Sequence, residues 1–224
     1  MRIDRRVFVL GAPLAVAGCA SQREMIVAAP GPTIDPHYRA MYDELPDEKH
    51  PVDAVDLTQI DEQFLRREVN FPTNEPVGTV IVDPSARYAY LVQGGGKAIR
   101  YGVGVGKTEA FNFNGVATIG RKAEWPHWTP TAKMVAREPD RYGPVAAGMV
   151  GGEDNPLGAR ALYLYRNGSD TFYRLHGTTE PYSIGTMVSS GCIRFLNQDI
   201  IDLYSRVPVG AKVIVRPARA TAAA

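Results

Sequence analysis

Cysteine is almost missing from this chain. Only Cys19 and Cys192 occur among its 224 residues, which excludes a disulfide framework in place of a hydrophobic core. Histidine is scarce too, with four residues, and no group of His and Cys has the spacing of a metal site. We therefore expect neither a metal nor any other cofactor.

Charge of one sign is not in excess either. The 25 Lys and Arg residues nearly balance the 24 Asp and Glu residues, and the formal net charge is +1. Nucleic-acid binding therefore has no bulk electrostatic basis. Nucleotide binding is not expected, because Gly106-Lys107-Thr108 ends like a phosphate-binding loop but Tyr101 stands at the position of its first glycine.

Long apolar runs are limited to residues 7–18, too few for an ordinary membrane-spanning helix of about 20 residues. Three arginines before this short run are typical of an export signal. The run ends in Val16-Ala17-Gly18-Cys19, which resembles a bacterial lipobox and implies a lipid on Cys19. The start also resembles a twin-arginine signal, with an ordinary Sec signal as the alternative. We expect a periplasmic protein anchored to a membrane by this lipid, and Ala20 after the cysteine favours the outer membrane.

These signals divide the chain into four parts. Residues 1–19 are predicted to be a lipoprotein signal peptide. Residues 20–70 are predicted to be a tether or N-terminal extension, because prolines and charges are scattered over residues 20–55 without a period. Within it, near-helical spacing of apolar residues predicts a short helix over residues 57–69, packed on the edge of the domain. Residues 71–217 are predicted to form the folded domain, and residues 218–224 a flexible tail.

From Gly78 onward, short β-branched and aromatic runs alternate with turn residues, which predicts strands and hairpins. The runs cover residues 78–83, 88–92, 98–105, 116–120, 161–165, 172–175 and 212–215. Asn167-Gly168 predicts a hairpin turn, and Asn197 is predicted to cap a helix through Tyr204. The expected fold is mainly β, with short helices and a mixed or antiparallel sandwich-like arrangement of strands.

Cys192 is the candidate nucleophile. If Cys19 carries a lipid, Cys192 has no disulfide partner, so by count alone it is either a reactive thiol or a small buried apolar residue. Ser189-Ser190-Gly191 before it are small, which leaves the thiol accessible and exposes backbone N–H groups. A thiol nucleophile needs a base near neutral pH, and His176 is the best placed of the four histidines because it ends a predicted strand.

Two segments then match a known family. His176-Gly177-Thr178 and Ser189-Ser190-Gly191-Cys192-Ile193-Arg194 resemble the signature of the L,D-transpeptidases with a YkuD-type catalytic domain. The resemblance extends from about Gly78 to Val215. The family usually has His directly before Gly-Cys, where this chain has Ser190. This departure puts rate and donor preference in doubt, while the family's base is retained as His176.

The resemblance implies a cell-wall enzyme. Cys192 would attack the bond between diaminopimelate and D-alanine in a peptidoglycan stem peptide, and the thioester would pass to an amine acceptor. His176 would be the base, and the carbonyl of Gly177 would orient it. The resemblance implies an oxyanion hole of backbone N–H groups from Gly191, Cys192 and Ser190, and substrate contacts from Arg194, Ser189, Tyr182 and Trp125.

The acceptor stays open in this interpretation. A second stem, a protein lysine, a free D-amino acid and water would all react with the same thioester. Water as acceptor would make the protein an L,D-carboxypeptidase. A different class of protein, a non-catalytic wall-binding lipoprotein, is the remaining alternative if Ser190 marks loss of activity.

Overall fold

The computed structural model describes residues 34–107, 113–189 and 191–217. The residues from Ile34 onward belong to one compact unit. Its strands are β1 Arg67–Asn70, β2 Val80–Asp83, β3 Tyr88–Val92, β4 Lys97–Gly102, β5 Val105–Gly106, β6 Gly115–Glu124, β7 Arg160–Arg166, β8 Ser169–His176, β9 Met187–Ser189, β10 Ile193–Arg194 and β11 Lys212–Val215. Its helices are α1 Pro36–Met41, α2 Ala132–Arg137, α3 Pro139–Tyr142 and α4 Asn197–Arg206, with 3-10 turns η1 Leu57–Gln59, η2 Glu62–Phe64, η4 Gly143–Val145 and η5 Pro181–Ser183. No helix in the described part of the chain is long and apolar enough to cross a membrane.

Nine strands form one mixed sheet, in the order β1-β4-β3-β2-β11-β6-β7-β8-β10. Most neighbours are antiparallel, but β2 and β11 run parallel, as do β8 and β10. The prediction of a mainly β fold with short helices is confirmed. The arrangement differs from the expected sandwich. Strand β11 lies between β2 and β6, and it joins two groups of strands, β1-β4-β3-β2 and β6-β7-β8-β10, into one sheet. Strands β5 and β9 form a separate small sheet.

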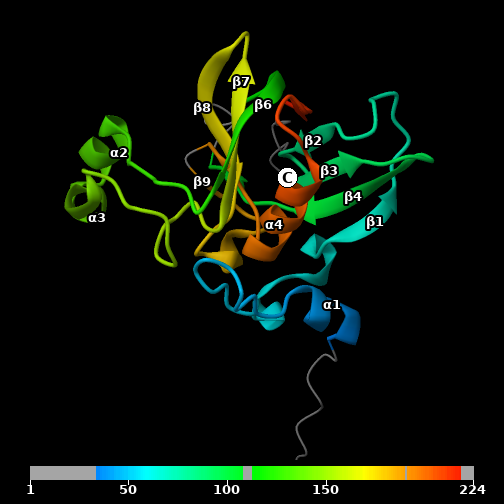
Figure 1. Ribbon diagram of the computed structural model, residues 1–224, viewed down its shortest axis with the longest axis horizontal. Coiled ribbons are helices and arrows are strands. Elements are labelled where there is room, and N and C mark those ends of the chain that lie inside the picture. Colours follow the sequence, from blue (N-terminus) through cyan, green and yellow to red (C-terminus); the bar gives the residue numbers. More distant parts are fainter. Residues whose placement is uncertain (1–33, 108–112, 190, 218–224) are drawn as a thin grey trace, which may run out of the picture. The chain divides into compact units, whose positions relative to one another are not determined.

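The main core lies where the two groups of strands face α4 (Figure 1). Val80 and Val82 of β2 are fully buried, as are Leu162 and Leu164 of β7, which explains their apolar runs. Helix α4 presents Ile200 and Leu203 to the same cluster. Burial of such side chains stabilises the fold by about 1.5–3 kcal/mol each.

The hairpin between β7 and β8 turns at Asn167-Gly168, as predicted, with Arg166 opposite Ser169. Asn167 has φ of 52° and Gly168 has φ of 78°, and both values belong to the turn type that Asn-Gly favours. This hairpin leads the chain directly to His176 at the end of β8.

Residues 34–70 are not a tether, in contrast to the prediction. Tyr42 is 1% exposed and Leu65 is 2% exposed, and both belong to a second apolar cluster of the compact unit. The expected helix over 57–69 is replaced by η1, η2 and β1, and β1 pairs with β4 at the sheet edge. Pro36, Pro46 and Pro51, which helped to suggest a tether, are exposed, but large apolar side chains of the same segment are buried. We call residues 34–66 the N-terminal extension.

Two other predicted regions lie outside the described residues. These are the signal peptide with Cys19 and the tail over residues 218–224. Helix α4 does begin near the predicted place, but its N-cap is Leu196, without a side-chain cap. The side chain of Asn197 is engaged elsewhere, as described below.

Candidate active site

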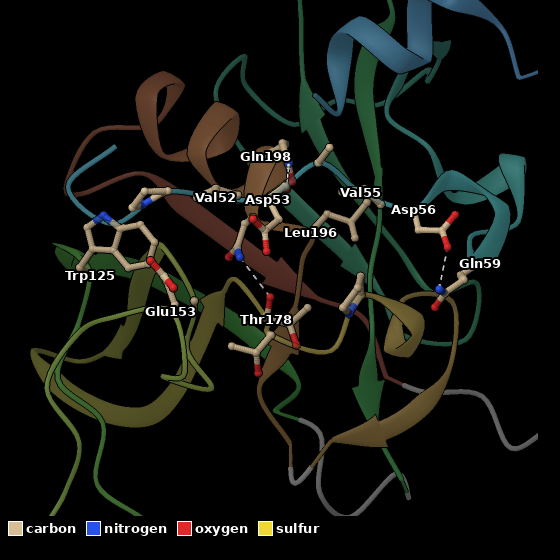
Figure 2. Close-up of a pocket in the computed structure, with 16 residues that line it drawn as sticks. Val52, Asp53, Val55, Asp56, Gln59, Trp125, Glu153, Thr178, Leu196 and Gln198 are labelled. Carbon is tan, nitrogen blue, oxygen red and sulfur yellow. Dashed lines mark hydrogen bonds between the residues drawn. The ribbon is translucent and has the colours of Figure 1, made fainter. Parts of the chain in front are cut away.

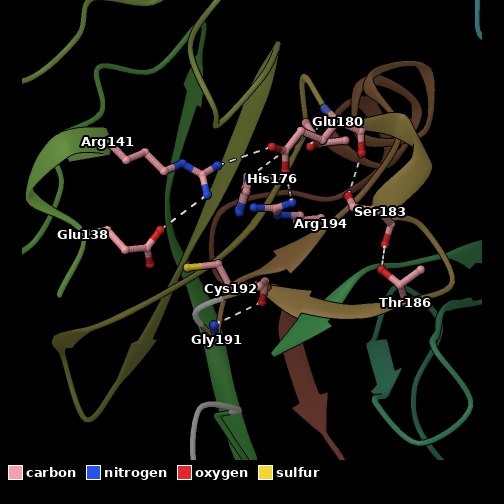
Figure 3. A network of polar contacts seen from close by, with 12 residues as sticks. Glu138, Arg141, His176, Glu180, Ser183, Thr186, Gly191, Cys192 and Arg194 are labelled. Atoms are coloured by element: carbon pink, nitrogen blue, oxygen red, sulfur yellow. Dashed lines mark hydrogen bonds and ion pairs between the residues drawn. The ribbon is translucent and has the colours of Figure 1, made fainter. Parts of the chain in front are cut away.

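The parallel pairing of β8 with β10 positions the two predicted catalytic residues. Leu175 lies opposite Ile193, and His176 lies opposite Arg194. Since side chains alternate between the faces of a sheet, Cys192 lies on the same face as Arg194 and His176. Figure 3 shows these three side chains grouped on that face. His176 and Cys192, which are 16 positions apart in the sequence, are thus brought together because the ends of β8 and β10 pair.

A backbone carbonyl sets the tautomer of His176. The Nδ1 atom lies 2.6 Å from the carbonyl oxygen of Gly177. A carbonyl can only accept a hydrogen bond, so Nδ1 carries the proton and donates. In the neutral ring, Nε2 is then the unprotonated nitrogen and can accept a proton. Gly177 also has no room for a side chain, because a Cβ there would collide with Oδ1 of Asn197.

His176 is held neutral at physiological pH. Burial lowers its pKa to about 3, and the positive charge of Arg194 acts in the same direction. The carbonyls of Gly177 and Leu157 oppose this shift but are outweighed. A neutral imidazole is the form that can act as a base.

The thiol of Cys192 is partly buried and lies 3.9 Å from the carbonyl oxygen of Phe172. Burial raises its pKa, against the opposing effect of Arg174, whose backbone N–H and guanidinium favour the thiolate. With a raised thiol pKa and a lowered imidazole pKa, the resting pair is a neutral thiol and a neutral imidazole. An ion pair between thiolate and imidazolium is not the resting state of this site.

Ser189 shapes the loop before the nucleophile. Its hydroxyl donates to the carbonyl of Cys192 at 2.7 Å and accepts from the backbone N–H of Gly191 at 3.1 Å. Ser189 is 3% exposed, so its side chain serves this loop and does not line a cleft as expected. The N–H of Gly191, expected in the oxyanion hole, is occupied by this bond. Ser190 lies outside the described residues.

Arg194 takes part in a chain of ion pairs beside the nucleophile (Figure 3). Its guanidinium contacts Glu180 at 2.6 Å, and Arg141 of α3 contacts the same carboxylate at 3.4 Å. A cavity of about 360 Å³ lies here. It is lined by Lys107, Arg137, Glu138, Arg141, Tyr142, Glu180, Tyr182, Val188 and Arg194. Four cationic and two acidic side chains therefore surround it, and Tyr182, 59% exposed, lies at its edge.

Comparison with known proteins places this geometry in a family. The model of the L,D-transpeptidase catalytic domain, YkuD, matches residues 78–215. The chain belongs to this family. The matched range contains the β8–β10 pair with His176 and Cys192, and it excludes the N-terminal extension.

Individual relatives of this L,D-transpeptidase domain agree with the assignment. The probable L,D-transpeptidase YbiS of Escherichia coli is 36% identical over 158 residues, which cover 69% of this chain and 50% of the relative. The probable L,D-transpeptidase YcfS of the same organism is 37% identical over 138 residues, covering 61% of this chain and 42% of the relative. The chain thus spans about half or less of the length of these curated relatives.

Solved structures similar to this chain were found as well. A chain from Brucella melitensis, described as a probable carnitine operon oxidoreductase, is 45% identical, with 71% of this chain and 98% of that chain covered and a TM-score of 0.48. An L,D-transpeptidase from Mycobacterium smegmatis is 20% identical, with 62% of this chain and 58% of that chain covered and a TM-score of 0.44.

Trp125 lies elsewhere in the L,D-transpeptidase domain than expected. It is 6% exposed, and its Nε1 donates to Glu48 of the N-terminal extension at 3.2 Å. It lines a different cavity, of about 320 Å³, between residues 51–59 and the loop after His176 (Figure 2). Neither His176 nor Cys192 lines that cavity. The aromatic character of Trp125 does not reveal this, because its partner Glu48 lies 77 residues earlier in the chain.

The structure adds three residues that the sequence analysis missed. Arg174 lies two residues before His176 on β8, and this spacing of two along a strand is the signal that could have placed it on the same face. Glu180 had no such signal. Asn197 accepts from the N–H of Ala159 at 3.0 Å and donates to the carbonyl of Thr178 at 3.1 Å. Its side chain therefore connects α4 to the segment before β7 and to the segment after β8.

Proposed function

We propose that this protein is a peptidoglycan L,D-transpeptidase with Cys192 as nucleophile and His176 as base. The observation that carries the proposal is the grouping of these two side chains beside the β8–β10 pair (Figure 3), with Nδ1 of His176 donating to Gly177 and Nε2 left as the unprotonated nitrogen of the neutral ring. Membership of the L,D-transpeptidase family supports the same reaction.

The first step acylates the thiol. Nε2 of His176 takes the proton of the Cys192 thiol while the sulfur attacks the carbonyl carbon between diaminopimelate and D-alanine. The tetrahedral intermediate collapses to a thioester, and the C–N bond breaks. His176 then returns its proton to the departing amine of D-alanine, so the ring is neutral again before the second step.

The oxyanion needs donors other than Gly191. The N–H of Gly191 is bound to Ser189, which leaves the backbone N–H of Cys192 as the remaining described donor of the predicted oxyanion hole. In our proposal this group, with Ser190, stabilises the negative oxygen. One such preorganised donor contributes about 3–4 kcal/mol to catalysis in other acyl-transfer enzymes.

The charged cavity beside Arg194 matches the donor chemically. A stem peptide carries carboxylates, and a guanidinium can bind a carboxylate with two hydrogen bonds. We propose that Arg194 and Arg141 bind a substrate carboxylate there, in competition with Glu180. Tyr182 at the edge of the cavity would pack against the peptide.

The second step transfers the acyl group to an amine. The acceptor amine attacks the thioester, His176 takes a proton from it, and the thiol leaves as Cys192 regains a proton. A second stem, a protein lysine and a free D-amino acid satisfy this chemistry equally. With water instead, the protein would be an L,D-carboxypeptidase.

Mass spectrometry of the protein with a disaccharide tetrapeptide, and separately with a carbapenem, tests the proposal. We expect an adduct on Cys192, release of D-alanine and a cross-linked or exchanged stem, all absent from Cys192→Ala. Release of D-alanine without a new amide bond would instead indicate the carboxypeptidase. A folded protein that forms no adduct would contradict both enzymes and favour a wall-binding lipoprotein.

We further propose export to the periplasm and a lipid on Cys19, on the basis of the lipobox-like sequence before it. The expected site of action, the peptidoglycan layer, is compatible with an anchor on the outer membrane. Cys19→Ala should move the protein from the membrane fraction to the soluble fraction. A variant that stays with the membranes would contradict lipidation at this residue.

A further inference from the structure

Glu48 of the N-terminal extension binds two strand ends of the catalytic domain. Its two carboxylate oxygens lie 2.7 and 2.9 Å from Nη2 of Arg160, the first residue of β7. The same carboxylate accepts from Nε1 of Trp125 at 3.2 Å, and Trp125 directly follows β6. Glu48 therefore fixes the end of β6 and the start of β7 together.

From Arg160 the contacts continue to the imidazole through the backbone. The carbonyl of Arg160 accepts from the N–H of Gly177 at 3.1 Å. The carbonyl of the same Gly177 accepts from Nδ1 of His176. The N–H and the carbonyl of Gly177 are thus both hydrogen-bonded. The backbone of Arg160 holds Gly177, and the carbonyl of Gly177 orients His176.

The ion pair between Glu48 and Arg160 is largely buried. Arg160 is 7% exposed, and Glu48 is its acidic partner among the described residues. A buried charge that loses its partner is strongly unfavourable, so the surrounding backbone rearranges or the side chain moves toward water. A rearranged backbone at Arg160 would move the carbonyl that accepts from the N–H of Gly177.

We propose that Glu48 is a positioning residue of the active site, through which the N-terminal extension orients His176. The extension lies outside residues 78–215, so this role belongs to a part of the chain beyond the matched catalytic domain. The proposal rests on the proposed function, because it concerns the base of that reaction.

Glu48→Gln tests the proposal, since it removes the charge and keeps the size of the side chain. We measure acylation of Cys192 by a carbapenem and, as a separate readout, the proton NMR signal of Nδ1–H in His176, which reports its hydrogen bond to Gly177. Acylation should be about 10- to 100-fold slower, as expected when a reacting group is misplaced by about 1 Å. The Nδ1–H signal should shift and exchange faster with solvent than in the wild type.

Tyr42→Phe is the matched control for loss of extension packing. Tyr42 is a buried residue of the extension, and its hydroxyl donates to Asp199 at 3.2 Å and accepts from the N–H of Arg66 at 2.6 Å. It does not contact Arg160. We expect a lower melting temperature with wild-type acylation well below that temperature. Glu44→Gln, an exposed residue four positions earlier, should change neither quantity.

The outcomes separate this proposal from the proposed function. A wild-type protein that is not acylated contradicts the proposed function, but the Nδ1–H signal of His176, assigned by its loss in His176→Gln, still reports the position of the imidazole. An Nδ1–H signal in Glu48→Gln that coincides with the wild type overturns the positioning role. Loss of acylation in Tyr42→Phe in proportion to its lowered stability overturns it as well. If Glu48→Gln does not fold, Glu48→Asp retains the charge but is one methylene shorter, and the same shift is expected in its Nδ1–H signal.

Discussion

At the scale of single residues, the site combines two neutral groups that burial holds neutral. The pKa of Cys192 is raised and the pKa of His176 is lowered to about 3, so no proton moves between them at rest. In the proposed reaction the proton moves only when the sulfur attacks, which would tie the formation of thiolate to the presence of substrate. This arrangement also protects a single thiol from oxidation, because the thiolate is the reactive form.

The alkylation of Cys192 by iodoacetamide should therefore rise with pH only above the usual thiol range, with a midpoint higher than about 8.5. Arg174→Ala should move the midpoint further up, because Arg174 favours the thiolate. Arg166→Ala, a substitution at the far end of the β7–β8 hairpin, is the control and should leave the midpoint unchanged. A plateau of fast alkylation below pH 7 would instead show a thiolate–imidazolium pair.

At the scale of elements, an irregular stretch of β8 faces the nucleophile. The pairing with β7 shifts between Tyr163 and Tyr165, and Phe172 adopts a φ of 63°. The N–H of Phe172 donates to Asp170 at 2.7 Å, which holds the strained backbone. Its carbonyl is the group beside the Cys192 thiol, so this bulge shapes the site directly.

Phe172→Gly should be more stable than Phe172→Ala by about 1 kcal/mol, because only Ala retains a Cβ in the left-handed region. Urea unfolding of the two variants measures the difference. The neighbouring position provides the control: Tyr173 does not have a positive φ, so Tyr173→Gly should be less stable than Tyr173→Ala. Equal stabilities at position 172 would show that the backbone there relaxes without cost.

Asn197, at the start of α4, belongs to the same scale, because one side chain joins a helix to two loops. Asn197→Ala should lower the free energy of unfolding by about 1–3 kcal/mol, since the N–H of Ala159 and the carbonyl of Thr178 lose their partner. Asn74→Ala, in an exposed loop, should change it by less than about 0.5 kcal/mol. Similar values for both substitutions would mean that water replaces Asn197 fully.

At the scale of the whole molecule, two buried groups give stability opposite dependences on pH. Burial raises the pKa of Asp199 to about 7 from 3.8, so its contribution is present below pH 3.8 and is lost as pH rises through about 7. His176 has a lowered pKa, so its contribution is present above pH 6.5 and is lost as pH falls toward 3. Between about pH 4 and 6.5 the two effects oppose each other.

Asp199→Asn should remove one of these effects. Its free energy of unfolding, relative to the wild type, should increase with pH between about 4 and 7 by up to about 1.4 kcal/mol per unit. The groups facing Asp199 are Tyr42, Arg66 and Asp202, and they are unchanged in the variant. Chemical denaturation across this pH range gives the slope, and parallel curves for the two proteins would show that Asp199 is ionised in the folded state.

Local sequence was sufficient for the hairpin, the core strands and membership of the family. Asn167-Gly168 specifies its own turn, and apolar runs such as residues 80–82 are buried wherever the sheet places them, because these properties depend on near neighbours in the chain. The two short segments around His176 and Cys192 likewise carry the family resemblance on which the proposed nucleophile and base rest.

Tertiary structure alone decided the rest. The apolar residues of the N-terminal extension follow no clear period along most of its length, so its packing became visible only once Ile184 and Leu196 provided a surface for Tyr42 and Leu65. The roles of Trp125, Ser189 and Glu48 depend on partners that are distant in the chain or on the fold of a short loop. The pKa values of His176 and Cys192 were also beyond the sequence, because the desolvation that shifts them is a property of the folded surroundings and not of the residues themselves.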